Sequence, residues 1–301
     1  MTARSGVRRT FTHRLRRVTT APKMEELVRT TAQRFGAVTS SARLLPSFLV
    51  VGGQRCGTTT LFRLLSDHPA IVPPLFSKGI GYFDLAYDRG WAWYRGHFPL
   101  ERVARLQTRA VGYPVTFESS GYYMYHPLAA DRIGRDLPGV RVVVLVRDPV
   151  ERAYSAYHHE LARGFETESF ERAIELEETR LAGEVERMTH DPTYQSFSHR
   201  HHSYLARGRY APQIGRLQRT VGVANVLIVD ANRFFESPSE RFGEVLDWLG
   251  VPHSQRTEAE QLNARPRPPM PDSLRDRLMA HFEDSDRALV PLLGAEPSWR
   301  A

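Results

Sequence analysis

A glycine-rich segment lies between an apolar run and three threonines, and its residue types suit the binding of an anion. The stretch reads FLVVGGQRCGTTTL over residues 48–61. Gly52, Gly53 and Gly57 let the backbone approach a ligand closely because they carry no side chain. The N–H groups at the start of the helix that follows have no partner within that helix, and such groups favour phosphate oxygens. The sequence therefore predicts a phosphate-binding loop at this point.

The loop differs from the Walker A sequence of nucleoside triphosphatases at its basic residue. Gly52 and Gly57 have the Walker spacing, but Thr58 stands in the place of the lysine. The basic residue lies earlier in the loop, at Arg55. A triphosphatase needs both that lysine and a Mg²⁺-binding hydroxyl, so half of the set is missing. The pattern favours an anionic ligand that is bound without a metal.

Three short apolar runs, with helical patterns around them, must position this loop. Residues 48–51, 140–146 and 225–229 read as buried strands. We expect helices at residues 24–35, 59–66, 150–163, 238–250 and 272–284. Buried strands that alternate with helices are typical of a parallel sheet with both faces covered. The sequence therefore predicts a single α/β domain with a P-loop-type parallel sheet flanked by helices on both faces.

The loop resembles that of the sulfotransferases that use 3′-phosphoadenosine 5′-phosphosulfate (PAPS), especially the branch of the heparan-sulfate enzymes and many bacterial relatives. In that family the loop reads like P-K-T-G-T-T or Q-K-x-G-T-T. Arg55 stands where the family has lysine; it can neutralise charge, but it is a poor proton donor. The resemblance implies PAPS as co-substrate, 3′-phosphoadenosine 5′-phosphate (PAP) as product and no metal. It also implies that the donor is bound by Gln54, Arg55, Cys56, Gly57, Thr58, Thr59 and Thr60.

A second segment, VVVLVRDPVERAYSAYHH at residues 142–159, resembles the motif that binds the 3′-phosphate in that family. The family has an arginine at the end of a strand and a serine eight residues later, and Arg147 and Ser155 keep this spacing. An arginine there can give a forked pair of donors to a phosphate. The alternatives are an ion pair between Arg147 and Asp148, and a buried structural role for Ser155. We expect Arg152, between them, at the surface.

Further resemblance extends over about residues 46–294. It is carried by three more segments, residues 78–99, 117–127 and 207–210. A Pro- and Arg-rich stretch at residues 265–270 is similar to the basic loop that closes over the nucleotide in the heparan branch. The resemblance adds three residues to the expected donor site, namely Tyr210, Arg265 and Arg267. It makes residues 46–301 the sulfotransferase domain.

The sequence departs from the family directly after Lys78. Heparan-type members carry a glutamate there that acts as catalytic base, whereas this chain has Gly79. Lys78 itself stays a candidate for stabilising charge on the phosphosulfate. The base must come from elsewhere, or the acceptor needs little help; our first choice is Glu118 and our second is His97. Two further titratable residues are also candidates, Asp84 and His68.

The positive charge of the chain is concentrated at its N-terminus. The chain has 41 Lys and Arg residues against 34 Asp and Glu, a formal net charge of +7. Residues 1–45 contain ten basic and two acidic residues, a net eight positive charges, so the remainder is close to neutral. We expect this segment to be a basic lead-in, flexible or helical, and we expect no nucleic-acid partner.

The other class indicators point to a cytoplasmic enzyme. Cys56 is the single cysteine, which excludes an intramolecular disulfide framework and fits a reducing compartment. No run approaches the roughly 18 apolar residues of a membrane span, and the Arg-rich start lacks the apolar run of a secretory signal. The histidines within residues 199–202 do not have the spacing of helical metal ligands, so we expect no metal.

Together these features predict a transfer of the sulfuryl group from PAPS to a hydroxyl or amine of a carbohydrate, glycolipid or secondary-metabolite acceptor. The sequence leaves the identity of this small-molecule or saccharide acceptor open, together with the oligomeric state. One alternative is a catalytically impaired protein that binds PAP or PAPS, which Gly79 favours. The other is a P-loop kinase with a degenerate Walker A loop, which would require Mg²⁺ and which Thr58 disfavours.

Overall fold

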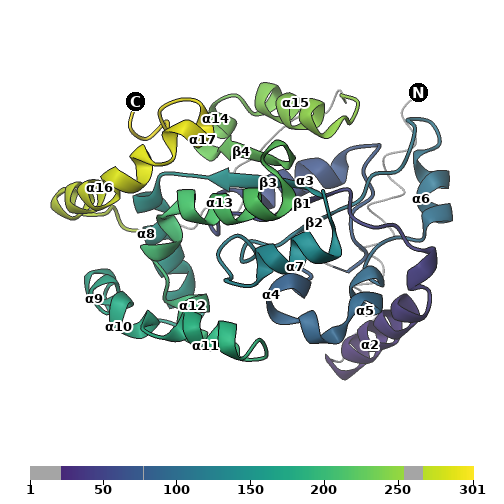
Figure 1. The fold of residues 1–301 in the computed structure, drawn as a ribbon, viewed down its shortest axis with the longest axis horizontal. Helices are drawn as coiled ribbons and strands as arrows, with labels where there is room; N and C mark the ends of the chain where they lie inside the picture. The colour runs from purple at the N-terminus through teal and green to yellow at the C-terminus, as the bar shows by residue number, and fades with distance from the viewer. Residues whose placement is uncertain (1–21, 77, 254–266) are drawn as a thin grey trace.

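A four-stranded parallel sheet forms the centre of the computed structural model, which describes residues 22–76, 78–253 and 267–301 (Figure 1). The strands lie in the order β2-β1-β3-β4. Their bounds are Phe48–Val50 for β1, Phe117–Ser119 for β2, Arg141–Val146 for β3 and Val226–Asp230 for β4. The predicted α/β fold with a parallel sheet is confirmed.

The two central strands are the continuously apolar ones. All of β1 is buried, and the residues of β3 from Val142 to Val146 have no exposed surface. Such strands are typical of a parallel sheet covered on both faces. The sequence did not reveal β2, because it is a three-residue edge strand with a glutamate at its centre. It is held in register by Phe48 opposite Phe117, whose rings stack at 5.2 Å.

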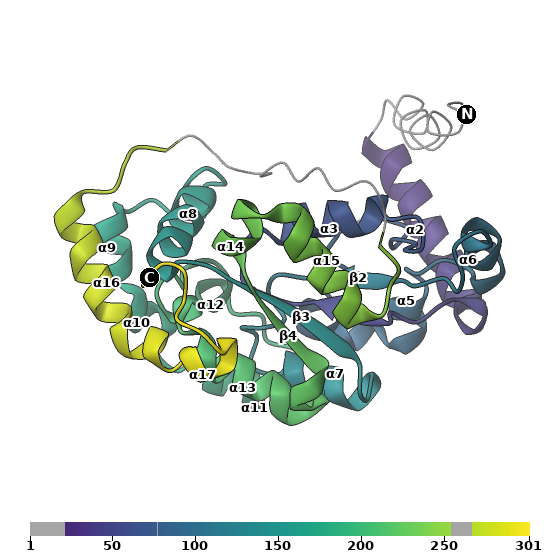
Figure 2. The ribbon, with the colours of Figure 1, turned by 90° about the horizontal axis from the view of Figure 1, so that it is seen from above.

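Helices cover both faces of this sheet. One face carries α3 (Thr58–Asp67), and the other carries α7 (Ala129–Asp136) and α13 (Tyr210–Val221), as Figure 2 shows. The last two helices approach closely, since a side-chain carbon at Gly134 would lie 3.0 Å from Thr220 O. The layers that the sequence predicts on the two sides of the sheet are therefore present.

The helix α8 (Pro149–Leu161) is capped by an aspartate, Asp148, two residues after the end of β3. Asp148 accepts hydrogen bonds from Val150 N at 2.9 Å and Glu151 N at 3.3 Å. These N–H groups have no partner within the helix, and an aspartate at this position satisfies them. The cap sets the direction in which α8 leaves the carboxyl edge of the sheet.

The other helices surround this frame. Between β1 and β2 lie α4 (Tyr82–Leu85), η2 (Tyr87–Arg89), α5 (Trp91–Arg95) and α6 (Glu101–Thr108). Between α8 and α13 lie α9 (Phe170–Glu175), α10 (Glu177–Leu181), α11 (Glu184–His190), α12 (Phe197–His201) and η3 (Ala206–Gly208). β4 is preceded by η4 (Val223–Asn225) and followed by α14 (Ala231–Glu236), α15 (Pro238–Leu249), α16 (Asp272–Arg287) and α17 (Val290–Leu293). The helices predicted at residues 59–66, 150–163, 238–250 and 272–284 are found as α3, α8, α15 and α16, within a few residues of the expected bounds.

A smaller hydrophobic core lies apart from the one around the sheet. It joins α8 to α9 and α16, and its aromatic members are Tyr154, Tyr157, Phe170, Tyr204 and Phe282. Because α16 packs on α8 in this core, the C-terminal part of the chain is brought to the start of α8.

The described part of the N-terminal segment is packed against the domain. α2 (Pro22–Val38) lies along α5, where a side-chain carbon at Gly36 would stand 2.6 Å from Gly96 O. Arg43 is 3% exposed, and its Nη1 donates to Phe98 O at 2.6 Å. The lead-in is therefore helical in this part, while residues 1–21 lie outside the described residues. None of the helices in the described ranges combines the length and apolar character of a membrane span.

Candidate functional site

The predicted phosphate-binding loop connects β1 to α3 and stays attached to β3 at its start. Gly53 N donates to Leu145 O at 2.9 Å. The chain then turns with positive φ angles of 70° at Arg55 and 89° at Gly57. A left-handed conformation costs a non-glycine residue roughly 1–2 kcal/mol. Contacts around Arg55 must therefore hold it in place.

The start of α3 is met by a lysine from a separate segment. Lys78 Nζ donates to Thr58 Oγ1 at 2.8 Å and to Thr59 Oγ1 at 2.9 Å. Burial, together with the positive charge of Arg55, lowers the pKa of Lys78 to about 8. Thr60 is buried at 1% exposure. A helix N-terminus and an ammonium group both favour an anion, so the structure places the expected lysine where it can act on one.

The two predicted motifs lie side by side. Arg55 Nε donates to Ser155 Oγ at 3.0 Å, and Arg147 Nη1 donates to Arg55 O at 3.4 Å. Residues 100 positions apart meet because parallel strands have their carboxyl ends at the same edge of the sheet. Ser155 and Arg147 are both half-buried, and the carboxylate nearest to Arg147 is that of Glu151, at 3.7 Å.

Glu151, in the first turn of α8, is surrounded by three arginines. Besides Arg147, Arg275 Nη1 lies 2.9 Å from Glu151 Oε1, and Arg267 Nη2 donates to Glu151 Oε2. The basic loop expected from the sequence therefore reaches the start of α8 through Arg267, while Arg265 lies outside the described residues. Arg275 was missed, because one arginine in an amphipathic helix gives no signal of a site.

The side chain of Gln54 is held within the protein at both ends. Its Oε1 accepts from Arg207 Nη1 at 2.7 Å, and its Nε2 donates to Glu160 Oε1 at 3.4 Å. Glu160 is 1% exposed and also contacts His201 Nδ1 at 2.9 Å. Arg207 is 5% exposed and lies over the ring of Tyr122. These contacts hold the loop in position at Gln54, and its contact with the donor stays a prediction.

Cys56 and Tyr210 lie beneath the loop. Cys56 has no exposed surface, and its Sγ lies 3.7 Å from the Tyr210 hydroxyl. That hydroxyl donates to Arg147 O at 2.8 Å. Burial raises the pKa of the Cys56 thiol. Both side chains therefore support the shape of the loop from the inside.

The prediction for Arg152 was wrong. It is a fully buried residue whose Nη2 donates to Tyr204 O. Its Nε and Nη1 have no hydrogen-bond partner among the described residues. The sequence pattern misled because η3 and α16 both pack on α8, so the face that carries residue 152 is enclosed.

The two residues chosen first as candidate bases lie in the aromatic interior. Glu118 has no exposed surface and accepts from the hydroxyls of Tyr94 at 2.7 Å and Tyr123 at 2.5 Å. Burial raises its pKa to about 7. His97 is 5% exposed, its Nδ1 lies 2.8 Å from Trp93 O, and burial lowers its pKa. These hydrogen bonds lead into the core and not to the loop.

The histidines near residue 200 take part in internal contacts. His199 Nδ1 lies 2.7 Å from the Tyr122 hydroxyl, and His202 Nε2 lies 2.9 Å from Phe165 O. In the ranges that the structure describes, no group of three or more His, Cys, Asp or Glu residues is arranged to hold a metal ion.

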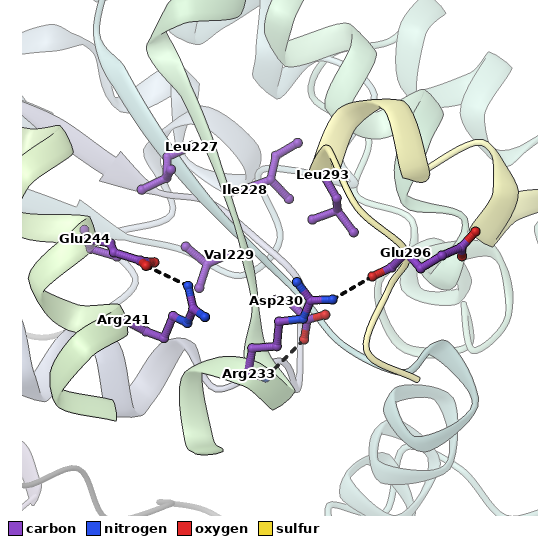
Figure 3. A pocket seen from close by; sticks show the side chains of 10 residues that line it. Leu227, Ile228, Val229, Asp230, Arg233, Arg241, Glu244, Leu293 and Glu296 are labelled. Atoms are coloured by element: carbon purple, nitrogen blue, oxygen red, sulfur yellow. Dashed lines mark hydrogen bonds and ion pairs between the residues drawn. The ribbon is translucent and has the colours of Figure 1, made fainter. Parts of the chain in front are cut away.

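A hollow of about 210 Å³ lies beside β4 (Figure 3). Both arginines of its lining donate to other lining residues: Arg241 Nη1 to Glu244 Oε1 at 2.6 Å, and Arg233 Nη2 to the backbone oxygen of Glu296 at 2.9 Å. None of the residues expected from the sequence lines this hollow. The candidate site is therefore the loop and its surrounding cations.

The fold and the site together define a class of protein. A buried strand leads through a glycine-containing loop into a helix, and the Walker lysine is replaced by Lys78 and by arginines from neighbouring segments. This is a P-loop-like α/β protein. The model of the sulfotransferase domain matches residues 45–265, and the chain belongs to the sulfotransferase family.

Known sulfotransferases are similar to most of the chain. Heparan sulfate glucosamine 3-O-sulfotransferase 6 of Mus musculus is 26% identical over 285 residues, which cover 85% of this chain and 74% of that protein. Membrane-associated sulfotransferase kil1 of Dictyostelium discoideum is 25% identical over 322 residues, 85% of this chain and 67% of that protein. The crystal structure of a sulfotransferase from Alicyclobacillus acidocaldarius is 28% identical with a TM-score of 0.61, over 86% of this chain and 100% of that one.

Proposed function

We propose that this protein transfers a sulfuryl group from PAPS to a hydroxyl or amine of a saccharide, glycolipid or other small acceptor. One observation carries the proposal: three cations gather around the loop. Lys78 is hydrogen-bonded to the start of α3, the Arg55 side chain donates to Ser155, and Arg147 donates to the backbone of Arg55. Membership of the sulfotransferase family supports the class of reaction.

The transfer exchanges one bond to sulfur for another. The acceptor atom attacks the sulfur, the bond from sulfur to the bridging oxygen of the donor breaks, and PAP leaves with its electron pair. The proton of the acceptor passes to a base. Negative charge grows on the bridging oxygen, so cations near that oxygen stabilise the transition state more than the ground state.

Lys78 and Arg55 are assigned to that bridging oxygen, with different roles. A pKa of about 8 leaves Lys78 mostly protonated at neutral pH, yet able to release a proton to the leaving group. Arg55 keeps its proton and supplies charge alone. In this proposal Lys78 supplies both charge and a proton, whereas Arg55, which stands in the place of the family's loop lysine, supplies charge alone.

The 3′-phosphate of the nucleotide is assigned to the other edge of the loop. Arg147 and Ser155 lie at the end of β3 and in α8, and Arg267 approaches the same first turn from the C-terminal part of the chain. Guanidinium groups can grip a phosphate with two parallel hydrogen bonds. This grip would distinguish PAP from nucleotides that lack a 3′-phosphate.

A saccharide hydroxyl is the first acceptor class to test. Two of the similar proteins are named for heparan sulfate, the 3-O-sulfotransferase 6 and the bifunctional N-deacetylase/N-sulfotransferase 4 of Mus musculus. The similarity to the second protein covers 71% of this chain but only 23% of that protein. It is therefore confined to one part of a larger enzyme.

The proposal is tested by offering PAPS with a panel of saccharides, phenols and alcohols. Chromatography should show PAP formed in step with a sulfated acceptor. Phosphoryl transfer from Mg²⁺-ATP with no transfer from PAPS would instead identify a kinase. Binding of PAP without turnover across the panel would identify an impaired nucleotide-binding protein.

A further inference from the structure

The position after Lys78 borders open space. Gly79 is exposed and has a φ of 80°. Among the described residues, a side-chain carbon built there would meet a single heavy atom within 4 Å, Ser119 O at 3.9 Å. The carboxylate that the family resemblance implies at this position is therefore missing, and the φ angle disfavours any side chain there. A group that removes a proton beside Lys78 must therefore come from another residue near the end of β2, where Ser119 lies.

Asp84 of α4 brings a carboxylate to that strand end. Its Oδ2 accepts from Ser120 Oγ at 3.3 Å. Its Oδ1 would lie 3.1 Å from a side-chain carbon at Gly81, so a larger residue at that position would crowd the carboxylate. The absence of a side chain at Gly81, between Lys78 and α4, thus leaves room around this aspartate.

The end of β2 connects Asp84 with the loop. Ser119 O faces Gly79, and Ser120 is hydrogen-bonded to Asp84. At the next residue, Gly121, a side-chain carbon would lie 3.8 Å from Gln54 Cα. Three consecutive residues therefore border the open position, the aspartate and the phosphate-binding loop.

We propose that Asp84 is the proton acceptor of the transfer and serves in place of the carboxylate missing at position 79. The inference rests on the proposed function. In this step the acceptor oxygen forms a bond to sulfur, and its proton moves to Asp84. The bond between sulfur and the bridging oxygen breaks, and its electron pair leaves with PAP, so the step needs no further reactant.

The surroundings of Asp84 suit a base that works near neutral pH. Burial raises its pKa to about 6, opposed by hydrogen bonds from Leu85 N and Ser120 and by the charge of Arg200. A base is most effective when its pKa lies near the working pH. The other titratable groups that interact with Asp84 are Glu118 in β2, Arg132 in α7, and Tyr122 and Tyr123 after β2.

Glu118 is less suited to this role. Both of its carboxylate oxygens accept tyrosine hydroxyls at 2.5 and 2.7 Å, and it has no exposed surface. Asp84 keeps 6% exposure, and its Oδ2 accepts a longer hydrogen bond of 3.3 Å. A proton can therefore reach Asp84 more directly than Glu118.

The test compares Asp84→Asn with Asp88→Asn, a control at an exposed aspartate four residues further along the same segment. Asp84→Asn should lower kcat by about 10²–10⁴-fold, the usual contribution of a general base. Its calorimetric affinity for PAP should stay within about twofold of the wild type. The wild-type kcat should rise with pH through about 6, where the carboxylate loses its proton, and this acidic limb should vanish in Asp84→Asn. Asp88→Asn should retain both the rate and the limb.

Wild-type turnover in Asp84→Asn would overturn the inference while leaving the proposed function intact. If Asp84→Asn fails to bind PAP, the wild-type profile decides: a rise near pH 6 supports the inference, and a flat kcat between about pH 5 and 7 contradicts it. A wild-type protein that neither binds PAP nor consumes PAPS would contradict the proposed function, and this inference with it.

Discussion

The site has two parts that are built in different ways. The proposed donor side is the loop with Arg147 and Ser155, and the proposed acceptor side is Gly79, Asp84 and the end of β2. On the donor side the loop passes directly from β1 into α3, and Arg147 stands directly between β3 and α8. On the acceptor side, Gly79, Asp84 and the end of β2 meet only through the tertiary fold. A short sequence pattern can therefore describe the donor side, whereas no local pattern describes the acceptor side.

Besides Asp84→Asn, the largest effect is expected from Lys78→Ala. It should lower kcat by about 10²–10³-fold, because charge on the bridging oxygen grows only in the transition state. Affinity for PAP, measured by calorimetry, should fall much less. In the wild type we expect kcat to fall as pH rises through about 8, where Lys78 loses its proton. Lys78→Arg keeps the charge, so it should retain more turnover than Lys78→Ala and should not show this fall. Equal losses in binding and turnover would make Lys78 a ground-state anchor.

The next effect concerns stability on the acceptor side. The pKa of Glu118 is about 7 in the folded protein, above the ordinary value of about 4.3. Between these values the folded protein binds one proton more than the unfolded chain, so raising the pH destabilises the fold. Glu118→Gln should remove up to about 3 kcal/mol of the loss seen between about pH 5 and 8 in urea unfolding. An identical pH dependence in the variant would contradict this account of Glu118.

A smaller effect is expected from Arg147→Ala on the donor side. Loss of a hydrogen bond to a charged group costs about 1.5–3 kcal/mol, so affinity for PAP should fall by about 10- to 150-fold. Affinity for ADP, which has no 3′-phosphate, should change far less. Arg172→Ala is the matched control, because Arg172 is exposed and pairs with Glu175. Equal losses for the two nucleotides would remove Arg147 from the 3′-phosphate site.

The smallest effect should come from EDTA. Charge on the donor is assigned to side chains and to the start of α3, so chelation should leave PAP affinity and sulfuryl transfer unchanged. The measurement is a titration of PAPS turnover with EDTA, and recovery of lost activity by Mg²⁺ would favour the kinase alternative.

The sequence revealed those parts of the molecule whose conformation depends on residues close together along the chain. The apolar runs at residues 48–51, 140–146 and 225–229 became β1, β3 and β4, and the loop with Lys78, Arg147 and Ser155 forms one group. Continuous apolar strands and turns that need glycine leave a clear pattern in any sequence that uses them.

The parts that the sequence did not reveal depend on tertiary contacts. The buried Arg152 looks like a surface residue until η3 and α16 cover it. Gln54 is drawn into contacts with Arg207 and Glu160, which lie more than 100 residues away. Arg275 reaches Glu151 only because α16 packs on α8. Side-chain partners of this kind have no fixed spacing along the chain.

The central claim is that the donor side recognises PAPS, and one calorimetric comparison of PAP with ADP tests it most directly. Each nucleotide carries two phosphates, but only PAP has one at the 3′ position, which we assign to Arg147, Ser155 and Arg267, whereas ADP has both in a 5′-diphosphate. We expect PAP to bind at least tenfold more tightly, a difference of about 1.4 kcal/mol or more. Equal affinities, or tighter binding of ADP, would contradict the account.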